Sequence, residues 1–495
     1  MSVSKDDVEP TQARREGTSG ISDEKSLGLE NSGLYIDPAI EKRVRRKIDC
    51  HLVPLVMGLY LVAFLDRSNI GNAETAGMSK DLGFDDVHYQ WLLTIFYIPY
   101  IVFEWAALMW QVVPPHIWAC CCVLVWGLAS TLQATVSNWS GLMVCRFFLA
   151  ASETGYGPGV PFLLSFFYKR HELGFRCGIF LSAAPLATTF AGALAYGVTS
   201  GSSKHISNWR LLFIVEGIPS ILLALVAFMC MPDSADTASF LTKEEKQVAK
   251  IRAIQQTGSE GSRIGHVKLG EIFSSLRDIK TWIPPFMYFS CNVAFGSLPI
   301  FLPAIIQNMG FAAINAQGLS APPYFLSFIV CIVTTWIADK THQRGLMIIG
   351  LSLIGGVGYI LLAACKSVAM RYFGVFLAAA GVFPAISNIL PWTINNQGSD
   401  SKRGTGIALL NIVGQCGPLL GTRLFPASDA PYYVKGMDVC AGFMFFNALL
   451  ALALRAYLVW ENKEFKRRDE AACQASIDPS SRPTENGGYG FRNFL

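Results

Sequence analysis

Apolar stretches of about twenty residues recur along this chain, and they limit what it can fold into. A helix needs about 20 apolar residues to cross ~30 Å of bilayer hydrocarbon. Of the 495 residues, 52% are hydrophobic and only 15% are charged, whereas about a quarter of the residues in a soluble domain are charged. We therefore predict an all-α membrane protein with twelve transmembrane helices. The predicted spans lie near residues 50–68, 91–112, 115–135, 142–166, 176–199, 210–231, 281–303, 320–338, 345–364, 371–392, 404–424 and 437–460.

A polar insert separates the first six predicted spans from the last six, which predicts two pseudo-symmetric six-helix bundles. We expect a helix over 241–256, where Thr242 and Glu245 form a capping box, and a second, amphipathic helix over 267–279 at the membrane surface. The insert is too short to form an enzyme domain with its own core. The predicted parts are a disordered cytoplasmic N-tail at 1–47, an N-terminal bundle at 48–232, a central loop at 233–279, a C-terminal bundle at 280–462 and a cytoplasmic C-tail at 463–495.

Positive charge marks one side of the predicted membrane protein. A basic cluster at 42–47 precedes the first span, while the loops at 136–141 and 304–319, on the opposite side, contain no Lys or Arg. Both termini are therefore expected in the cytoplasm, and we expect the protein in the plasma membrane. The polar first 40 residues show no cleavable signal peptide, so the first span must itself direct insertion. Asn138 begins a glycosylation triplet on the outer side, but its loop is so short that we expect it to stay unmodified.

The predicted span at 142–166 carries two charged residues, Arg146 and Glu153. Ionised groups are costly in hydrocarbon, so residues of this kind face protein or water and are functional candidates. They lie seven residues apart, which places them on one face of a helix. The alternative is a structural Arg–Glu bridge between spans. Small residues and a proline, which allow close helix packing and loosen the helix, follow at Gly155, Gly157, Pro158 and Gly159.

Several blocks of sequence together indicate a family. They are FLDRSNIGNAETAGM at 64–78, GF at 83–84, YIPYIVFE at 97–104, RFFLAASETGYGPGV at 146–160, WRLLFIVEGIP at 209–219, PWTINNQGSDSKR at 391–403 and APYYVKG at 430–436. With the six-plus-six arrangement, they resemble the major facilitator superfamily, and within it the fungal anion:cation symporters of the allantoate-permease group, which includes nicotinate transporters. The resemblance extends from about residue 41 to residue 465.

One block departs from the family pattern. After Glu104 the family usually has Pro-Ser-Asn and basic residues of a cytoplasmic gating motif, but residues 105–118 contain no Lys or Arg. The counterpart in the second half retains Asp339 and Arg344, which the resemblance implies as gating residues. The departure suggests a differently built gate on the first half and a specialised substrate.

Transporters of this family hold substrate near the midplane between two halves that rock around it. Resemblance to related organic-anion transporters, sialin and the vesicular glutamate carriers, implies that Arg67 recognises a substrate carboxylate. Tyr60 shares a helix face with Arg67 by its spacing, and Asp66 is a candidate for tuning Arg67 or closing an outer gate. The alternative is that Asp66 and Arg67 lie at the outer membrane interface.

The same resemblance assigns proton and substrate handling to the pair in the fourth span. It implies Arg146 as a second substrate-binding cation and Glu153 as the proton carrier. Glu104 is a competing proton carrier, or else a structural partner of cytoplasmic arginines. In the second half, Tyr288 and Asn292 form an i, i+4 pair that we predict to contact substrate. Helix-to-helix hydrogen bonding is the preferred interpretation of Asn388, Trp392, Asn395, Asn411 and Gln415.

We predict a secondary transporter that couples a proton to a small organic anion, a carboxylate or vitamin-like molecule, by alternating access. The alternatives are an exporter of a fungal secondary metabolite and a non-transporting nutrient sensor. We expect a monomer in the lipid bilayer, with no enzyme activity, cofactor or nucleic-acid partner. The 13 cysteines show no metal-ligand spacing, and there is no Gly-rich nucleotide loop followed by Lys-Ser/Thr.

Overall fold

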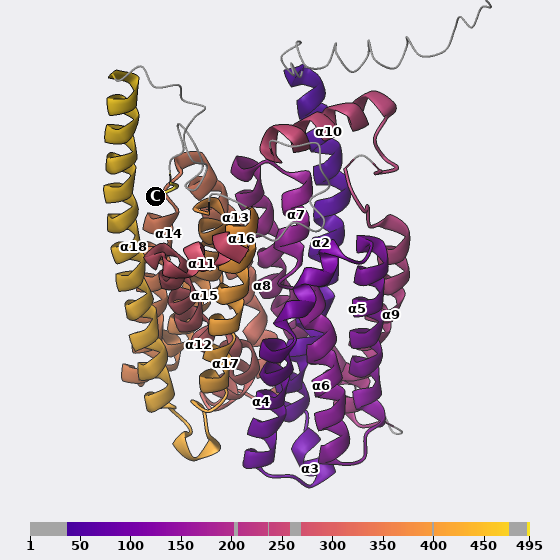
Figure 1. The fold of residues 1–495 in the computed structure, drawn as a ribbon. Coiled ribbons are helices and arrows are strands. Elements are labelled where there is room, and N and C mark those ends of the chain that lie inside the picture. The colour runs from indigo at the N-terminus through magenta and orange to yellow at the C-terminus, as the bar shows by residue number, and fades with distance from the viewer. Residues whose placement is uncertain (1–36, 202–205, 236, 258–268, 398–399, 475–492) are drawn as a thin grey trace, which may run out of the picture.

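The structure, a computed structural model, describes residues 37–201, 206–235, 237–257, 269–397, 400–474 and 493–495, and the regular elements in these ranges are helices (Figure 1). The first half contains α2 (Pro38–Thr75), α3 (Met78–Leu82), α4 (Asp86–Val102), η1 (Glu104–Gln111), α5 (Pro115–Leu132), η2 (Gln133–Thr135), α6 (Trp139–Tyr156), α7 (Val160–Phe167), α8 (Arg170–Ser200) and α9 (Asn208–Cys230). The insert contains α10 (Lys243–Thr257) and α11 (Leu269–Arg277). The second half contains α12 (Ile279–Gln307), α13 (Ala313–Thr341), α14 (Arg344–Ala364), α15 (Val368–Asn395), α16 (Asp400–Gly414), α17 (Cys416–Gly421), η3 (Ala427–Asp429) and α18 (Val434–Gln474). The predicted all-α fold is confirmed.

Nine helices in the described ranges are long and apolar enough to cross a membrane. The other three predicted spans are each broken into two pieces. They become α4 with the 3-10 helix η1, α6 with α7, and α16 with α17. Two of the breaks contain glycine and proline, at Gly157–Gly159 and at Gly414–Pro418, residues that weaken helices by backbone freedom and by the lost N–H donor. The predicted spans are therefore present, but three of them are discontinuous.

The two halves stand side by side in Figure 1, the first in indigo to magenta and the second in orange to yellow. Helix α8 packs against α13 and α15 of the second half, and α2 packs against α12. Helix α2 begins and α18 ends at the same end of the molecule, drawn at the top of Figure 1. We call this end the terminal end and the other the opposite end.

Two predicted boundaries differ from the structure. Helix α2 already begins at Pro38, because the Asp37 carboxylate accepts the N–H of Ala39 at 2.9 Å and caps the first turn. The predicted boundary at residue 47 therefore falls inside a helix. Helix α18 runs to Gln474, beyond the predicted end of the bundle at residue 462. Of the tail predicted to be disordered, residues 1–47, residues 1–36 lie outside the described residues, and residues 38–47 belong to α2.

The insert is attached to the terminal end of the first half. The predicted capping box is present, since Thr242 N–H donates to the Glu245 carboxylate at 2.9 Å and Glu245 N–H donates to the Thr242 hydroxyl at 3.4 Å. The same carboxylate accepts from Lys47 of α2 at 2.8 Å, and Arg252 of α10 pairs with Glu41 of α2 at 2.8 Å. Helix α10 is thus held on the first half by charge.

Candidate functional site

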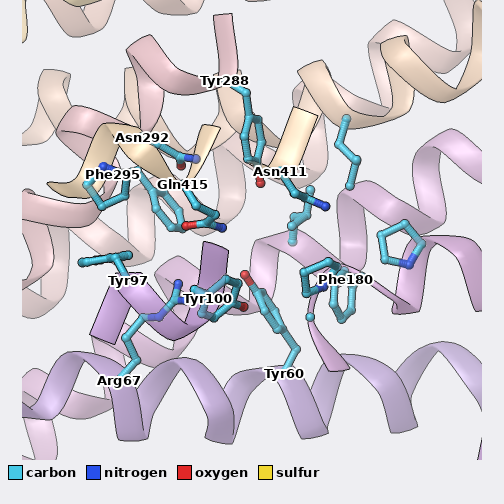
Figure 2. A pocket seen from close by; sticks show the side chains of 16 residues that line it. Tyr60, Arg67, Tyr97, Tyr100, Phe180, Tyr288, Asn292, Phe295, Asn411 and Gln415 are labelled. Atoms are coloured by element: carbon cyan, nitrogen blue, oxygen red, sulfur yellow. The ribbon is translucent and has the colours of Figure 1, made fainter. Parts of the chain in front are cut away.

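The three broken helices meet around a cavity between the halves (Figure 2). Helix α4 contributes Tyr97 and Tyr100, the break between α6 and α7 contributes Pro158, and α17 contributes Pro418. The lining residues border about 530 Å³ of space not filled by atoms, part of which is open solvent. Transporters commonly place broken helices at the substrate site, because the freed backbone groups are available to bind ligands.

Arg67 is the one formally charged side chain among the sixteen described residues that line this cavity. It lies on α2 about two turns before that helix ends and is 8% exposed, so the structure does not place it at the end of its helix. Its guanidinium carbon lies 4.6 Å from the ring centre of Phe96 and 4.8 Å from that of Tyr100. Aromatic faces attract cations, and these rings therefore hold the guanidinium beside the cavity, as Figure 2 shows for Tyr100.

Glu153 pairs with Arg67 rather than with Arg146. Arg67 Nη2 and Glu153 Oε1 lie 3.3 Å apart, and the Glu153 side chain is 1% exposed. Arg146 instead donates from Nη1 to the backbone carbonyl of Arg67 at 3.1 Å. Arg146 and Glu153 do share a face of α6, but two turns of helix separate them by about 11 Å along the axis, so each meets a different part of α2. Arg146 is not among the residues that line the cavity, and its predicted contact with substrate stays a prediction.

Asp66 points into the first half rather than toward the second. Its two carboxylate oxygens each accept a hydrogen bond at 2.6 Å, one from Ser130 of α5 and one from Ser220 of α9. The predicted outer-gate role is not supported by this position, because a gate residue has to face the interface between the halves. Nearby on α9, Glu216 is 3% exposed, and within the described residues neither of its carboxyl oxygens has a hydrogen-bond partner. Glu216 had no predicted role from the sequence.

The second half contributes amides and aromatic rings. Tyr288 and Asn292 line the cavity as a pair, together with Tyr60 from the first half (Figure 2). Asn292 also donates to the carbonyl of Gly414, at the break between α16 and α17, at 3.1 Å. Glu104 does not line the cavity. It is 4% exposed at the start of η1, next to Asn411 of α16, so its polar neighbour belongs to the second half.

The predicted gating residues lie at the interface between the halves at the terminal end. Asp339 and Arg344, at the ends of α13 and α14, form an ion pair. The second oxygen of Asp339 accepts the backbone N–H of Phe175, on α8 of the first half, at 2.7 Å. The Arg344 guanidinium lies so close to Gly174 that a Cβ there would collide with it. Both residues therefore contact the first half, on one side of the cavity.

A second set of contacts joins the halves at the opposite end. Gln317 of α13 donates to the hydroxyl of Thr75 on α2 at 2.9 Å and accepts from Thr199 on α8 at 2.8 Å. The hydroxyls of Thr94 and Thr422 lie 3.4 Å apart across the same interface. Along α8 the cavity lies between the two sets of contacts. The structure is therefore joined across the halves at both ends of the cavity.

Several residues at or beside the cavity were not assigned to it from the sequence. Tyr97 and Tyr100 belong to a block that indicated the family, and their i, i+3 spacing around Pro99 was the available signal. Asn411 and Gln415 were interpreted as helix-to-helix contacts, yet both line the cavity. Their position just before the Gly-Pro break in α16–α17 was the sign of a site rather than of simple packing.

Trp110 fills the break between α6 and α7. It comes from the block that departs from the family pattern and is 2% exposed. Its indole N–H donates to the carbonyl of Gly155 at 2.8 Å, and its ring occupies the space where Gly159 would carry a Cβ. The basic residues of the family motif are thus replaced by apolar packing against the broken helix.

One further predicted residue, Asn138, has a definite location. Asn138 caps α6 by accepting the N–H of Gly141 at 2.8 Å and is exposed. In the described ranges no group of three or more His, Cys, Asp or Glu side chains is arranged to hold a metal ion.

Comparison with known proteins establishes the family. The Major Facilitator Superfamily model matches residues 56–422. The MFS-type transporter efuF of Hormonema carpetanum is 32% identical over 440 residues, which cover 88% of each chain. The high-affinity nicotinic acid transporter of Saccharomyces cerevisiae is 31% identical over 443 residues, covering 89% of this chain and 82% of that protein. The structure of the proton:xylose symporter XylE shares the fold with a TM-score of 0.63 at 13% identity, over 83% of this chain and 94% of that one. This chain is therefore an integral multi-pass membrane protein of the Major Facilitator Superfamily, a class of transporters and not of enzymes.

Proposed function

We propose that this protein carries a small planar carboxylate across the plasma membrane together with a proton, by alternating access of its two halves. The observation that carries the proposal is the position of Arg67, the charged group of a cavity otherwise lined by neutral residues. A guanidinium presents its donors in a planar fork that matches a carboxylate. The buried Nε and Nη2 of Arg67 make no hydrogen bond within the described residues, so the protein leaves part of the donor capacity of this guanidinium unused.

The walls of the cavity favour a flat, unsaturated substrate. Tyr60, Phe180, Tyr288 and Phe295 supply ring faces and edges around the space in front of Arg67, and aromatic rings pack well against one another in stacked or edge-on arrangements. The relative named as a nicotinic acid transporter supports an aromatic carboxylate as the first class to test.

The coupling of proton to substrate follows because the substrate carboxylate and Glu153 compete for Arg67. With the cavity empty, Arg67 and Glu153 neutralise each other at 3.3 Å. A substrate carboxylate that binds Arg67 takes the positive charge of Arg67 away from Glu153. A buried carboxylate without a counter-ion is strongly destabilised. Glu153 then takes up a proton, and the loaded carrier contains one substrate anion and one proton. Glu104, beside Asn411, is the second candidate for the proton site.

The orientation and the gates complete the proposal. The basic clusters at the terminal end support a cytoplasmic position of both termini. Asp339 and Arg344 act there as the cytoplasmic gate against α8, and the contacts of Gln317 act as the outer gate. Substrate would enter and leave as the halves separate at one end and approach at the other.

The test is uptake of radiolabelled nicotinate, benzoate and allantoate by cells that lack their own carboxylate permeases, at acid and at neutral pH. We expect faster uptake of an aromatic carboxylate at acid pH. Arg67→Gln should abolish uptake, and Arg467→Gln, which changes an exposed arginine in the polar last part of α18, should leave it unchanged. Surface expression of each variant is measured alongside.

Three outcomes would contradict the proposal. Uptake that does not depend on Arg67 would remove the carboxylate site from this cavity. Loss of a preloaded metabolite, with no uptake of any carboxylate tested, would identify an exporter. Saturable binding of a carboxylate to purified protein without translocation in liposomes would identify a sensor.

A further inference from the structure

Three residues, Asn493, Phe494 and Leu495, lie against the second half at the terminal end. The side-chain amide of Asn462, on α18, pairs with both backbone groups of Asn493, accepting from its N–H at 2.8 Å and donating to its C=O at 3.0 Å. The side-chain amide of Asn396, the C-cap residue of α15, pairs with both backbone groups of Phe494 in the same way. It accepts from the Phe494 N–H at 2.8 Å and donates to the Phe494 C=O at 3.1 Å. Two asparagines on different helices therefore each bind one residue of this segment through its backbone.

The remaining backbone groups are bound by the loop between α13 and α14. Leu495 N–H donates to the carbonyl of His342 at 3.1 Å, and Leu495 C=O accepts from Gly345 N–H at 3.2 Å. Trp392 adds an indole N–H to the Phe494 carbonyl at 2.8 Å. Each backbone N–H and C=O of the three residues is thus paired, in the way that an extended peptide is bound by a receptor.

Side chains add to the fit of this site. The Asn493 amide donates to the Glu461 carboxylate at 2.6 Å, and the other oxygen of that carboxylate accepts from Lys280 at 2.8 Å. Asn493 is 5% exposed. The rings of Phe494 and His342 meet edge to face, with centres 4.8 Å apart. A segment with a fully paired backbone, whose first residue is buried and whose other two are half-buried, is held by a formed site.

The site is built around the loop between the two gating residues, Asp339 of α13 and Arg344 of α14. His342 follows Asp339 by three residues and has a φ of 54°, a left-handed conformation that non-glycine residues rarely adopt. Such backbone persists only where its surroundings hold it in place. Leu495 and Phe494 contact His342 through backbone and ring, and Gly345 lies next to Arg344. The docked segment therefore holds this loop from both sides.

We propose that residues 493–495 are an intramolecular ligand of the 342–345 loop, and that their docking keeps the terminal end closed. Docking orders the loop in the conformation in which Asp339 and Arg344 reach α8 of the first half. Opening at this end requires that contact to break, so the docked segment favours the closed state and slows opening. The inference does not depend on the substrate or on the proton site.

The reactivity of a native cysteine can show whether the terminal end is open or closed. Cys177 lies on α8, is fully buried, and has Asp339 and Arg344 as its charged neighbours in the second half. Its alkylation by a membrane-permeant maleimide, followed in membranes by peptide mass spectrometry, measures how often the terminal end opens. We expect deletion of residues 493–495 to raise the alkylation rate about fivefold or more, the lower range for coupling between two sites.

Point variants locate the effect. Asn396→Asp is nearly isosteric but replaces the amide donor facing the Phe494 carbonyl by a carboxylate oxygen, so it should raise the rate as the deletion does. Asn308→Asp makes the same change in an exposed residue at the other end of the second half, where the amide meets Tyr433 at 2.9 Å. It should leave the rate of Cys177 unchanged.

Rescue by a peptide separates docking from general loosening. A synthetic peptide of residues 489–495 should bind the deletion variant saturably and return the Cys177 rate to that of the intact chain. A peptide with the same residues in scrambled order should do neither. The proposal is overturned if the deletion leaves the Cys177 rate unchanged, or if the native-sequence peptide does not slow alkylation of the deletion variant.

Discussion

Arg67 and Glu153 form an ion pair between α2 and α6, with Nη2 and Oε1 3.3 Å apart and both side chains buried. Arg67 also lines the cavity, whereas Glu153 lies just behind it. A buried pair of this kind is sensitive to the loss of either member, because the remaining charge is left uncompensated. A ligand that competes for Arg67 therefore removes the counter-ion of Glu153.

Replacement of Glu153 by Gln should uncouple transport from the proton. The variant retains a side chain of similar size but cannot take up or release a proton, so a pH gradient of one unit, which can drive about tenfold accumulation in the parent, should drive none. Exchange of labelled for unlabelled substrate, which needs no net proton movement, should continue. The measurement is accumulation and exchange in liposomes with and without an imposed pH gradient. Accumulation equal to that of the parent would remove Glu153 from the coupling and leave Glu104 as the candidate.

Replacement of Arg67 by Lys should weaken substrate binding while leaving the charge balance with Glu153 intact. Lysine keeps the positive charge but lacks the planar fork and its contacts with the rings of Phe96 and Tyr100. We expect the KM for the carboxylate to rise about tenfold, the effect of losing one hydrogen bond to a charged group. Uptake as a function of concentration checks this, with the exposed Arg467→Lys as control. An unchanged KM would show that the substrate binds elsewhere.

The sequence predicted the helices well because the length and composition of an apolar block largely determine whether it spans a membrane. The breaks after Val102, Tyr156 and Gly414 were not predicted, because glycine and proline are also tolerated within continuous membrane helices. Whether a helix breaks there depends on what fills the gap, and Trp110 fills one of these breaks from a distant part of the chain.

The candidate site was predicted only where one helix face sufficed. Tyr60 and Arg67 on α2, and Tyr288 and Asn292 on α12, reach the cavity together, as helical spacing indicates. Partners on different helices do not follow from spacing, so the Arg67–Glu153 pair could not be derived from the sequence. The same reason explains Asp66, whose serine partners lie 64 and 154 residues further along the chain.

Replacement of Gly159 by Ala should destabilise the protein. The added methyl group meets the indole of Trp110, and forcing extra volume into a packed interior costs about 1–3 kcal/mol. Gly197→Ala on α8 is the matched control, since a Cβ there has no heavy atom within 4 Å. Thermal unfolding of the purified proteins compares the two. Equal stability of both variants would show that Trp110 does not occupy the break between α6 and α7.

Replacement of Gln317 by Leu should favour opening at the opposite end. It removes the hydrogen bonds to Thr75 and Thr199 that join the halves there, each worth about 1 kcal/mol. We expect a cysteine introduced at Thr94 to react about fivefold or more faster with an impermeant maleimide. Alkylation of Cys177 should slow, because the halves approach at one end as they separate at the other. Faster reaction at both positions would indicate general loosening instead of a gate.

Acid should release α10 from the first half. Burial raises the pKa of Glu245, but the hydrogen bonds from Lys47 and from the Thr242 backbone outweigh it and lower the pKa below 4.5. Because the folded-state pKa is depressed, this pair stabilises docking above the unfolded-state pKa, and the stabilisation is lost as the pH falls through the lowered folded-state value. Hydrogen–deuterium exchange of α10, corrected for the intrinsic pH dependence of exchange, should therefore increase below about pH 4.

Two variants test the assignment to Glu245. Glu245→Gln should raise the exchange of α10 at neutral pH about two- to fivefold, as expected for a partly exposed ion pair, and should remove the part of the acid transition that depends on Glu245. Glu244→Gln changes the exposed neighbouring residue and should behave as the parent does. If the acid transition persists in Glu245→Gln, a different carboxylate holds α10, and Glu41, which accepts from both Arg252 and Lys169, is the next to replace.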